Sequence, residues 1–300
     1  GSTLDPIYYE FYTAKIGGNQ FESDLQGRIG PIILWDRKLT TTELNVVNDY
    51  YKTIYMVPDP TPTPTPTPLP DLPNIIQSGL TIFVDGSGSS YLGSGTTWTS
   101  RATGTTYNGT IYGSPTWSGL QNGFFTFDGV NDYVTIPTFA NKPSSQITCE
   151  AWIYPTKPSV GTGTIRGGVI SATSNMYLGI IDSTDGGSTF SLHWANNTEN
   201  GSQRPYSWTG SIPNNAWTYI AGTYNGATSR AYINSVEVWS AAQTGTIPDS
   251  TYVVGTYGSG LTDGVHNFLG QISVARMYNI GLSASQVLQN YNAQKYRFGR

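Results

Sequence analysis

The stretch that decides the fold lies at residues 147–155 and reads Ile147-Thr148-Cys149-Glu150-Ala151-Trp152-Ile153-Tyr154-Pro155. Small or aliphatic residues occupy every second position, and Thr, Glu, Trp and Tyr occupy the positions between them. Because successive side chains of a β-strand point to opposite faces, this alternation predicts a strand with one face against an apolar core. Cys149, the one cysteine of the chain, falls on the apolar face and is interpreted as a small core residue.

Stretches of the same kind recur over most of the chain. They share branched, aromatic or alternating apolar residues, and strands are expected at residues 80–84, 124–127, 133–136, 176–181, 189–194, 217–224, 229–233, 236–239 and 268–278. Turn signals separate them, such as the tight turn expected at residues 128–132. One short helix is expected near the end, from about Ser283 to Gln294. This order predicts an all-β fold, an antiparallel sandwich or barrel.

Composition and charge exclude several classes of function. Charged residues make up only 11% of the chain, and residues 74–300 carry ten basic and ten acidic side chains. Without a basic surface, nucleic acid is not expected as a partner. No apolar run approaches the roughly 20 residues that cross a bilayer, so membrane insertion is not expected. One cysteine can form neither an internal disulfide framework nor a cysteine-based zinc site.

A proline-rich segment, residues 57–73, divides the chain and contains the run Thr61-Pro62-Thr63-Pro64-Thr65-Pro66-Thr67-Pro68. Alternating proline removes every second backbone donor, so the segment can enter neither a helix nor a sheet and is expected to be an extended linker. A ligand for SH3-type domains is the alternative, but the flanking basic residues of such ligands are missing here. The linker predicts folded units on both of its sides.

The segment before the linker repeats the end of the chain. At a constant offset of 243 positions, residues 25–44 pair like chemistry with residues 268–287. Both copies contain a capping box, in which a hydroxyl and a side chain three residues later satisfy two free donors at a helix start. The capping residues are Thr40 with Glu43 and Ser283 with Gln286.

This repeat suggests two related domains. We interpret residues 1–56 as the C-terminal remnant of a first domain and residues 74–300 as a complete second domain of the same kind. A lone hairpin and helix cannot bury enough surface to be stable. The remnant is therefore expected to dock on the second domain or to exchange between chains, which would give a homo-oligomer.

Four motifs together resemble the concanavalin A-like, laminin-G-like jelly-roll family. Residues 127–134 resemble its FDG-x-NDY signature, residues 147–155 its T-x-E-A-W-x-x-P strand, residues 217–234 its hairpin pair, and residues 270–291 its closing strand and helix. The resemblance implies a two-sheet antiparallel jelly-roll sandwich with a short C-terminal helix. Ser235 departs from the pattern, because the family has Gly at this turn position, so a wider turn is expected here.

The resemblance also implies a setting. Tandem jelly rolls joined by a Thr-Pro linker are similar to bacteriophage virion fibres and secreted bacterial adhesins. An extracellular or virion-surface location is expected, with other virion or surface proteins as partners.

The family includes glucanases and lyases, so catalysis must be considered. A retaining glycosidase needs two carboxylates about 5–5.5 Å apart, which on a strand requires acidic residues two or four positions apart. Glu150 and Glu237 each stand alone in their strands. No catalytic residue is therefore predicted, although a lyase cluster of His193, Arg204 and Tyr206 is conceivable.

Carbohydrate binding fits the sequence better than catalysis. Sugars stack on exposed aromatic rings and accept or donate hydrogen bonds to amides and carboxylates. A polar loop at residues 193–211 is bracketed by two tryptophans, and a cell-surface glycan or polysaccharide is the expected ligand. The candidate glycan-binding residues are Trp194, Asn196, Glu199, Arg204, Tyr206 and Trp208. The alternative is that both tryptophans belong to the core and the loop is merely solvated.

Calcium is the one cofactor that the sequence suggests. This ion takes about 6–8 oxygen ligands, and Asp128, Asn131 and Asp132 crowd a single turn. The alternative is that these side chains form the turn by hydrogen bonding to their own backbone. The sequence thus predicts a non-enzymatic carbohydrate-binding or adhesion module of a virion or cell-surface protein. A purely structural virion module and a polysaccharide lyase or hydrolase are the alternatives.

Overall fold

The computed structural model of the chain describes residues 37–45, 47, 75–88, 90–102, 107–120, 123–156, 166–172, 176–182, 189–203, 209–258 and 266–300. The chain divides into two units, residues 1–63 and 64–300, and each is treated by itself. The predicted linker at residues 57–73 and most of the predicted remnant at residues 1–56 lie outside the described residues.

In the first unit, residues 41–45 are helical, and the predicted capping box precedes them. Thr40 Oγ1 accepts a hydrogen bond from the Glu43 N–H at 3.3 Å, and Glu43 Oε2 accepts one from the Thr40 N–H at 2.9 Å. Arg37 adds a two-point ion pair with the same carboxylate, at 2.7 and 3.0 Å. The helix start predicted from the repeat is therefore confirmed.

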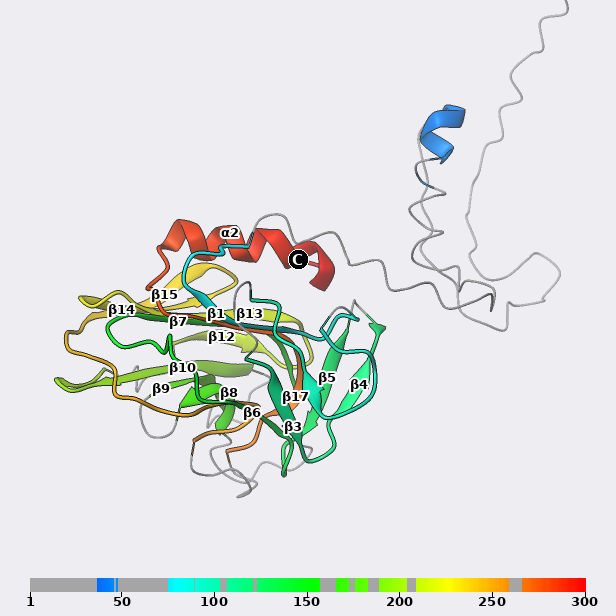
Figure 1. Cartoon of the computed structure of the whole chain (residues 1–300). Coiled ribbons are helices and arrows are strands. Elements are labelled where there is room, and N and C mark those ends of the chain that lie inside the picture. Colours follow the sequence, from blue (N-terminus) through cyan, green and yellow to red (C-terminus); the bar gives the residue numbers. More distant parts are fainter. Residues whose placement is uncertain are drawn as a thin grey trace, which may run out of the picture. The chain divides into compact units, whose positions relative to one another are not determined.

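The second unit contains two antiparallel sheets that face each other (Figure 1). Within the described residues the first sheet has 8 strands, which in spatial order are β15 (Val236–Ala242), β14 (Thr228–Ile233), β13 (Thr218–Tyr224), β7 (Ile147–Pro155), β17 (Leu269–Tyr278), β5 (Phe124–Asp128) and β4 (Thr116–Ser118), with β1 (Leu80–Asp85) beside β17. The second sheet has 9 strands over the same residues, in the order β11 (Gly201–Gln203), β10 (Thr189–Thr198), β9 (Met176–Asp182), β8 (Arg166–Ala172), β16 (Tyr252–Val254), β6 (Tyr133–Ile136), β3 (Gly109–Tyr112) and β2 (Thr97–Trp98), with β12 (Thr209–Pro213) beside β10. The predicted all-β sandwich is confirmed.

The predicted alternation of β7 is confirmed as well. One face of the strand is fully buried in the core between the sheets and consists of Ile147, Cys149, Ala151 and Ile153. The opposite face carries Glu150 and Trp152, and Trp152 packs in a second apolar cluster with residues of the C-terminal helices. A strand that is buried on both faces needs a further layer, which here is helical.

Helix α2 (Ala284–Gln294) and the 3₁₀ helix η2 (Lys295–Phe298) form that further layer on the first sheet (Figure 1). The predicted capping box starts α2, because Ser283 Oγ accepts from the Gln286 N–H at 3.3 Å and Gln286 Oε1 accepts from the Ser283 N–H at 2.9 Å. Below the helices, the ring of Trp152 stacks on Phe298 with centroids 4.2 Å apart. Such aromatic pairs add about 0.5–1.5 kcal/mol to the free energy of area burial.

A fully buried ion pair lies under α2. Arg276 Nε donates to Glu150 Oε1, and the Tyr219 hydroxyl donates to Glu150 Oε2. Asn290 on α2 donates to both carboxylate oxygens, at 3.0 and 3.2 Å, and Arg276 also donates to Gln294 Oε1 at 2.7 Å. Burial, together with the charge of Glu150, raises the pKa of Tyr219 well above its ordinary value, so its hydroxyl stays a donor. Glu150 therefore joins the sheet to the helix.

The hairpin between β14 and β15 corrects one expectation. Ile233 and Val236 are direct cross-strand partners, so the turn contains two residues and is not a wider loop. Asn234 has a φ of 48° and Ser235 a φ of 67°, the positive values that a type I′ turn requires. Ser235 therefore adopts the left-handed conformation that favours glycine.

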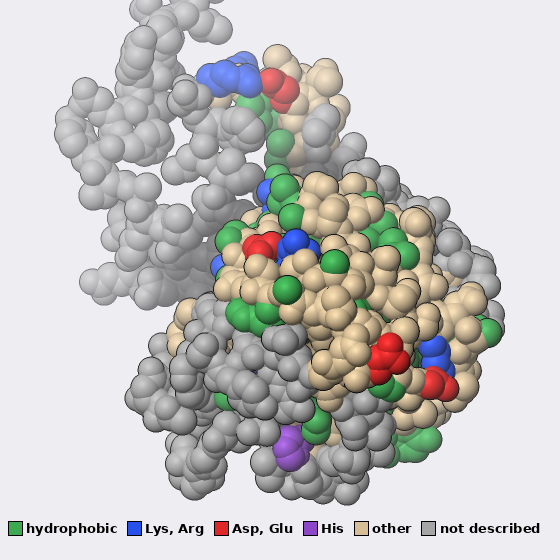
Figure 2. Space-filling view, turned by 90° about the vertical axis from the view of Figure 1, so that its left-hand side faces the viewer, with side chains coloured by type: hydrophobic (Ala, Val, Ile, Leu, Met, Phe, Trp, Pro, Cys, Tyr) green, Lys and Arg blue, Asp and Glu red, His purple; other side chains and the backbone are tan. Residues whose placement is uncertain are grey.

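The surface carries few charges. Figure 2 shows one face of the molecule, on which lysine, arginine, aspartate and glutamate side chains form small and separate patches. This agrees with the charged fraction of 11% in the sequence. Among the residues that the structure describes, no helix is long and apolar enough to cross a membrane.

Candidate functional site

The candidate site lies where two segments of the chain cross between the sheets. Residues 113–115 connect β3 of the second sheet to β4 of the first, and residues 129–132 connect β5 of the first sheet to β6 of the second. The tight turn expected at residues 128–132 therefore joins the two sheets instead of two neighbours in one sheet. This difference brings side chains from both sheets together.

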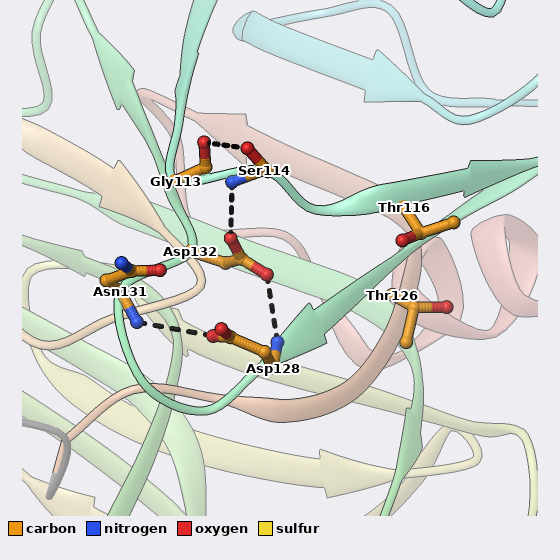
Figure 3. A pocket seen from close by; sticks show the side chains of 7 residues that line it. All are labelled: Gly113, Ser114, Thr116, Thr126, Asp128, Asn131 and Asp132. Atoms are coloured by element: carbon orange, nitrogen blue, oxygen red, sulfur yellow. Dashed lines mark hydrogen bonds between the residues drawn. The ribbon is translucent and has the colours of Figure 1, made fainter.

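Asp132 fastens the two crossing segments to each other (Figure 3). Its buried carboxylate accepts from the Ser114 N–H at 2.7 Å through Oδ1 and from the Asp128 N–H at 3.0 Å through Oδ2. Burial raises the pKa of Asp132 above its ordinary value, and the two backbone hydrogen bonds act in the opposite direction. Gly113 has a φ of +80°, and a Cβ there would lie 2.3 Å from Asp132 Oδ1, so this close approach requires glycine.

Asp128 stabilises the second crossing segment, residues 129–132, through its own side chain. Its exposed carboxylate accepts from the Val130 N–H at 2.8 Å and from the Asn131 N–H at 3.2 Å, both through Oδ1. This is the Asx-turn pattern, in which a side chain satisfies backbone donors two and three residues later. The Oδ2 atom takes no part in these turn bonds.

A cavity of about 310 Å³ is lined by residues of both crossings and of the strands beside them (Figure 3). The lining residues are Gly113, Ser114, Thr116, Thr126, Asp128, Asn131 and Asp132. Thr116 and Thr126 are cross-strand partners on β4 and β5, so their side chains lie on the same face of the sheet. Every side chain in the lining is a hydroxyl, an amide or a carboxylate, which suits a ligand rich in hydrogen-bonding groups.

Two tyrosines are the sequence neighbours of residues that line the cavity. Tyr112 ends β3 directly before Gly113, and Tyr133 starts β6 directly after Asp132. The two tyrosines are cross-strand partners, and their rings stack with centroids 4.9 Å apart and 9° between the planes. The side chain of Tyr112 is 44% exposed. Each tyrosine thus lies one residue along the chain from a residue of the cavity lining, and Tyr112 is the exposed member of the pair.

The hydrogen bonds of this turn compete with calcium, whose binding here stays a prediction. Three of the four carboxylate oxygens of Asp128 and Asp132 already accept backbone N–H groups, whereas calcium needs about 6–8 oxygen ligands. In the described ranges, no three His, Cys, Asp or Glu side chains gather where they could hold a metal ion. The contacts of Asp128, Asn131 and Asp132 favour the alternative interpretation, in which the side chains form the turn.

The structure contradicts the glycan-binding interpretation of Trp194 and Asn196, because both side chains are fully buried. The indole of Trp194 lies in the core between the sheets and donates through Nε1 to Ser229 Oγ at 2.8 Å. A Cβ on Gly222 would lie 2.2 Å from the indole ring. A sugar cannot stack on a ring without an exposed face, so Trp194 is a core residue, which is the alternative that the sequence left open.

The other candidates of the 193–211 loop are not brought together in the described residues. Glu199 is exposed after β10, and its Oε1 accepts from the Thr246 N–H at 3.4 Å. Arg204, Tyr206 and Trp208 lie outside the described residues, so their part in glycan binding stays a prediction.

The cavity lined by the two crossing segments is called the rim cavity below. Sequence reasoning did not identify Ser114 and Thr116, which line it, or Tyr112, which precedes Gly113 of its lining. A weak signal exists, because residues 110–112 and 116–118 consist of Thr, Ile, Tyr, Trp and Ser, which include good strand formers. The two strands are short, however, and the pairing of Thr116 with Thr126 depends on contacts that a linear sequence does not display.

The comparison with protein families shows which superfamily the sequence matches. The model of the concanavalin A-like lectin/glucanases superfamily matches residues 128–288. The chain belongs to this superfamily. The match begins at Asp128 itself, on the rim of the cavity, and ends within helix α2. No match was found among the curated proteins.

Solved structures of the superfamily's fold agree with this assignment. Domain 4 of AbnA, an extracellular arabinanase from Geobacillus stearothermophilus in complex with arabinotriose, is 18% identical with a TM-score of 0.53, over 71% of this chain and 98% of that domain. The ligand-binding domain of botulinum neurotoxin serotype D, in complex with N-acetylneuraminic acid, is 14% identical with a TM-score of 0.53, over 73% and 52%. Trypanosoma rangeli sialidase is 14% identical with a TM-score of 0.51, over 74% and 34%. This chain thus spans one whole arabinanase domain but only part of the other two proteins, and at these identities the likeness concerns the fold.

Proposed function

We propose that the domain at residues 74–300 binds carbohydrate without cleaving it, and that the rim cavity with the Tyr112–Tyr133 pair is the binding site. The observation that carries this proposal is a cavity with only polar side chains whose two crossing segments each continue directly into one member of a stacked tyrosine pair, with Tyr112 exposed. Sugars present an apolar C–H face and a ring of hydroxyls. A glycan of several sugar residues can therefore use both kinds of contact.

The tyrosine ring and the cavity offer different contacts to a sugar. The exposed ring of Tyr112 offers a stacking platform for a C–H face of the sugar. The hydroxyls of Thr116 and Thr126, the amide of Asn131 and the carboxylate of Asp128 offer donors and acceptors for sugar hydroxyls. The cavity volume, about 310 Å³, is at the lower end for small-molecule sites, which fits one sugar residue of a longer glycan.

The described carboxylates support binding rather than hydrolysis. Glu150 is fully buried and held by Arg276, Tyr219 and Asn290. Asp132 has both oxygens engaged by backbone N–H groups. Of the lining residues, this leaves Asp128 as the one carboxylate with an oxygen outside the turn bonds, whereas glycoside hydrolysis uses a pair.

Relatives of the same fold give further support. The arabinanase domain was solved with arabinotriose and the neurotoxin domain with N-acetylneuraminic acid, so sandwiches of this kind can carry sugar sites. The arabinanase is described as extracellular. A location outside the cell or on a virion, with a cell-surface glycan as partner, is the setting in which we place this domain.

The test is binding of the full chain to a glycan array, followed by titration calorimetry with the glycans that bind. Tyr112→Ala is expected to weaken binding about tenfold or more, which corresponds to about 1.4 kcal/mol of lost stacking. Tyr296→Ala is the matched control. Tyr296 is also an exposed tyrosine, at 81%, but it lies on η2, in the helical layer over the first sheet. Equal affinity of wild type and Tyr112→Ala would contradict the proposed site.

A further inference from the structure

The charged side chains that line the rim cavity are all negative. Asp128 and Asp132 are the charged residues of its lining, and both are acidic. The basic side chains with ion pairs in the described part of the chain are committed elsewhere: Arg37 to Glu43, Arg101 and Arg297 to Asp85, Lys142 to Asp249, Arg230 to Glu237, and Arg276 to Glu150. None of these pairs includes Asp128 or Asp132.

Three backbone donors of the lining are engaged by the protein's own carboxylates. Proteins bind anions through arginine side chains or through clusters of backbone N–H groups. Here the N–H groups of Ser114 and Asp128 donate to Asp132, and those of Val130 and Asn131 donate to Asp128. The protein's own carboxylates thus occupy the backbone donors of both turns that an anionic ligand could otherwise use.

From these two observations we infer that the rim cavity selects neutral sugars and rejects sugars that carry a carboxylate or a sulfate. The inference rests on the proposed function and narrows its ligand class. A sugar anion at this place would meet the charge of Asp128 without a basic side chain in the lining, and the N–H groups of Ser114, Asp128 and Asn131 are already engaged. The repulsion between two like charges is stronger near a protein surface than in bulk water.

The experiment compares pairs of sugars that differ in charge. We would titrate the full chain with lactose and 3′-sialyllactose, and with trigalacturonic acid and its methyl ester, with arabinotriose as a further neutral probe. The neutral member of a pair is expected to bind at least about tenfold more tightly than the charged member. Tyr112→Ala is expected to weaken binding of the neutral member.

Asp128→Asn tests the cause of the selectivity. The Asn side chain keeps an oxygen that can accept from Val130 and Asn131, but it removes the negative charge. The ratio of neutral to charged affinity is expected to fall about tenfold in this variant. Asp249→Asn changes the net charge equally at an exposed aspartate that pairs with Lys142, and it should leave the ratio unchanged.

The outcomes separate the two proposals. If charged sugars bind as tightly as neutral ones and Tyr112→Ala weakens both, the inferred selectivity is wrong and the proposed function stands. If the ratio falls equally in Asp128→Asn and Asp249→Asn, net charge and not the cavity sets the preference, and the inference is again wrong. If no probe and no array glycan binds, or if Tyr112→Ala leaves binding intact, the proposed function itself is wrong.

Discussion

Two buried carboxylates of this domain are satisfied in opposite ways. Glu150, under helix α2, has a charged partner in Arg276 and side-chain donors in Tyr219 and Asn290. Asp132, at the rim, has only the backbone N–H groups of Ser114 and Asp128 on its oxygens. Both carboxylates join segments that are distant along the chain, yet one lies in a closed interior and the other lines a cavity.

The difference shows how a buried acid can be structural or can belong to a site. An acid whose charge is neutralised by a buried base, with donors on both oxygens, has no capacity left for a ligand. An acid that is held by backbone alone keeps its negative charge unpaired beside the cavity and so influences what enters. Three substitutions test and sharpen this comparison.

Arg276→Met is expected to have the largest effect. It leaves Glu150 buried without its basic partner, and breaking a buried pair in this way costs about 3–5 kcal/mol of unfolding free energy. Urea denaturation of the full chain, followed by tryptophan fluorescence, measures the loss.

The double variant Glu150→Leu with Arg276→Met is the control. It removes the unpaired charge together with the pair, and replacement of a buried pair by apolar residues is often neutral or stabilising. We expect it to recover most of the stability that the single variant loses. A single variant within about 1 kcal/mol of wild type would mean that the ion pair does not hold the helix on the sheet.

Asp132→Asn is expected to have an intermediate effect. The amide keeps one acceptor oxygen but turns an NH₂ group toward the second backbone donor, which costs about 1–3 kcal/mol. Because burial raises the pKa of Asp132, its folded-state contribution is largest when the carboxyl is protonated and falls as the pH rises through the native pKa. The deficit of the variant should therefore be larger at about pH 3 than at about pH 7.

Asp128→Asn provides the matched control for this pH dependence, because it keeps the oxygen that accepts from Val130 and Asn131. Denaturation curves at both pH values are compared among wild type and the two variants. A deficit of Asp132→Asn that grows with pH would contradict the raised pKa and the burial that causes it.

The sequence predicts the fold well because the fold depends on local periodicity. The alternation at residues 147–155, the closing strand and the capping boxes at Thr40 and Ser283 each follow from spacing within a few residues. Burial then acts on patterns that are already present, so the two faces of β7 could be assigned correctly. The partner of Glu150, 126 positions further along the chain, has no such local signal.

The candidate site was harder to predict, because it depends on contacts between residues that are not close in the sequence. In the sequence Trp194 looks equally suited to a ligand and to a core. Its full burial, with Gly222 of the opposite sheet against the indole, decides in favour of the core. The cluster of Asp128, Asn131 and Asp132 was visible in the sequence, but its chemistry depends on which N–H groups face each oxygen. The tyrosines and threonines of the rim meet through cross-strand register, which no short motif encodes.

Ser235→Gly is expected to have the smallest effect, with the opposite sign. Ser235 lies in a hairpin turn of the sheet that also contains Glu150, and its φ of 67° is costly for a residue with a Cβ. Glycine removes this strain but adds freedom to the unfolded chain, so a net gain of about 0.5–1 kcal/mol is expected. In a domain of this size that gain corresponds to a rise of about 1–4 °C in Tm, measurable by differential scanning calorimetry. Ser235→Ala keeps the Cβ and the strain, so it should show no such rise. Equal Tm values for the glycine and alanine variants would mean that the turn relaxes in solution. The position would then no longer serve as the uncharged reference against which the losses at Arg276 and Asp132 are measured.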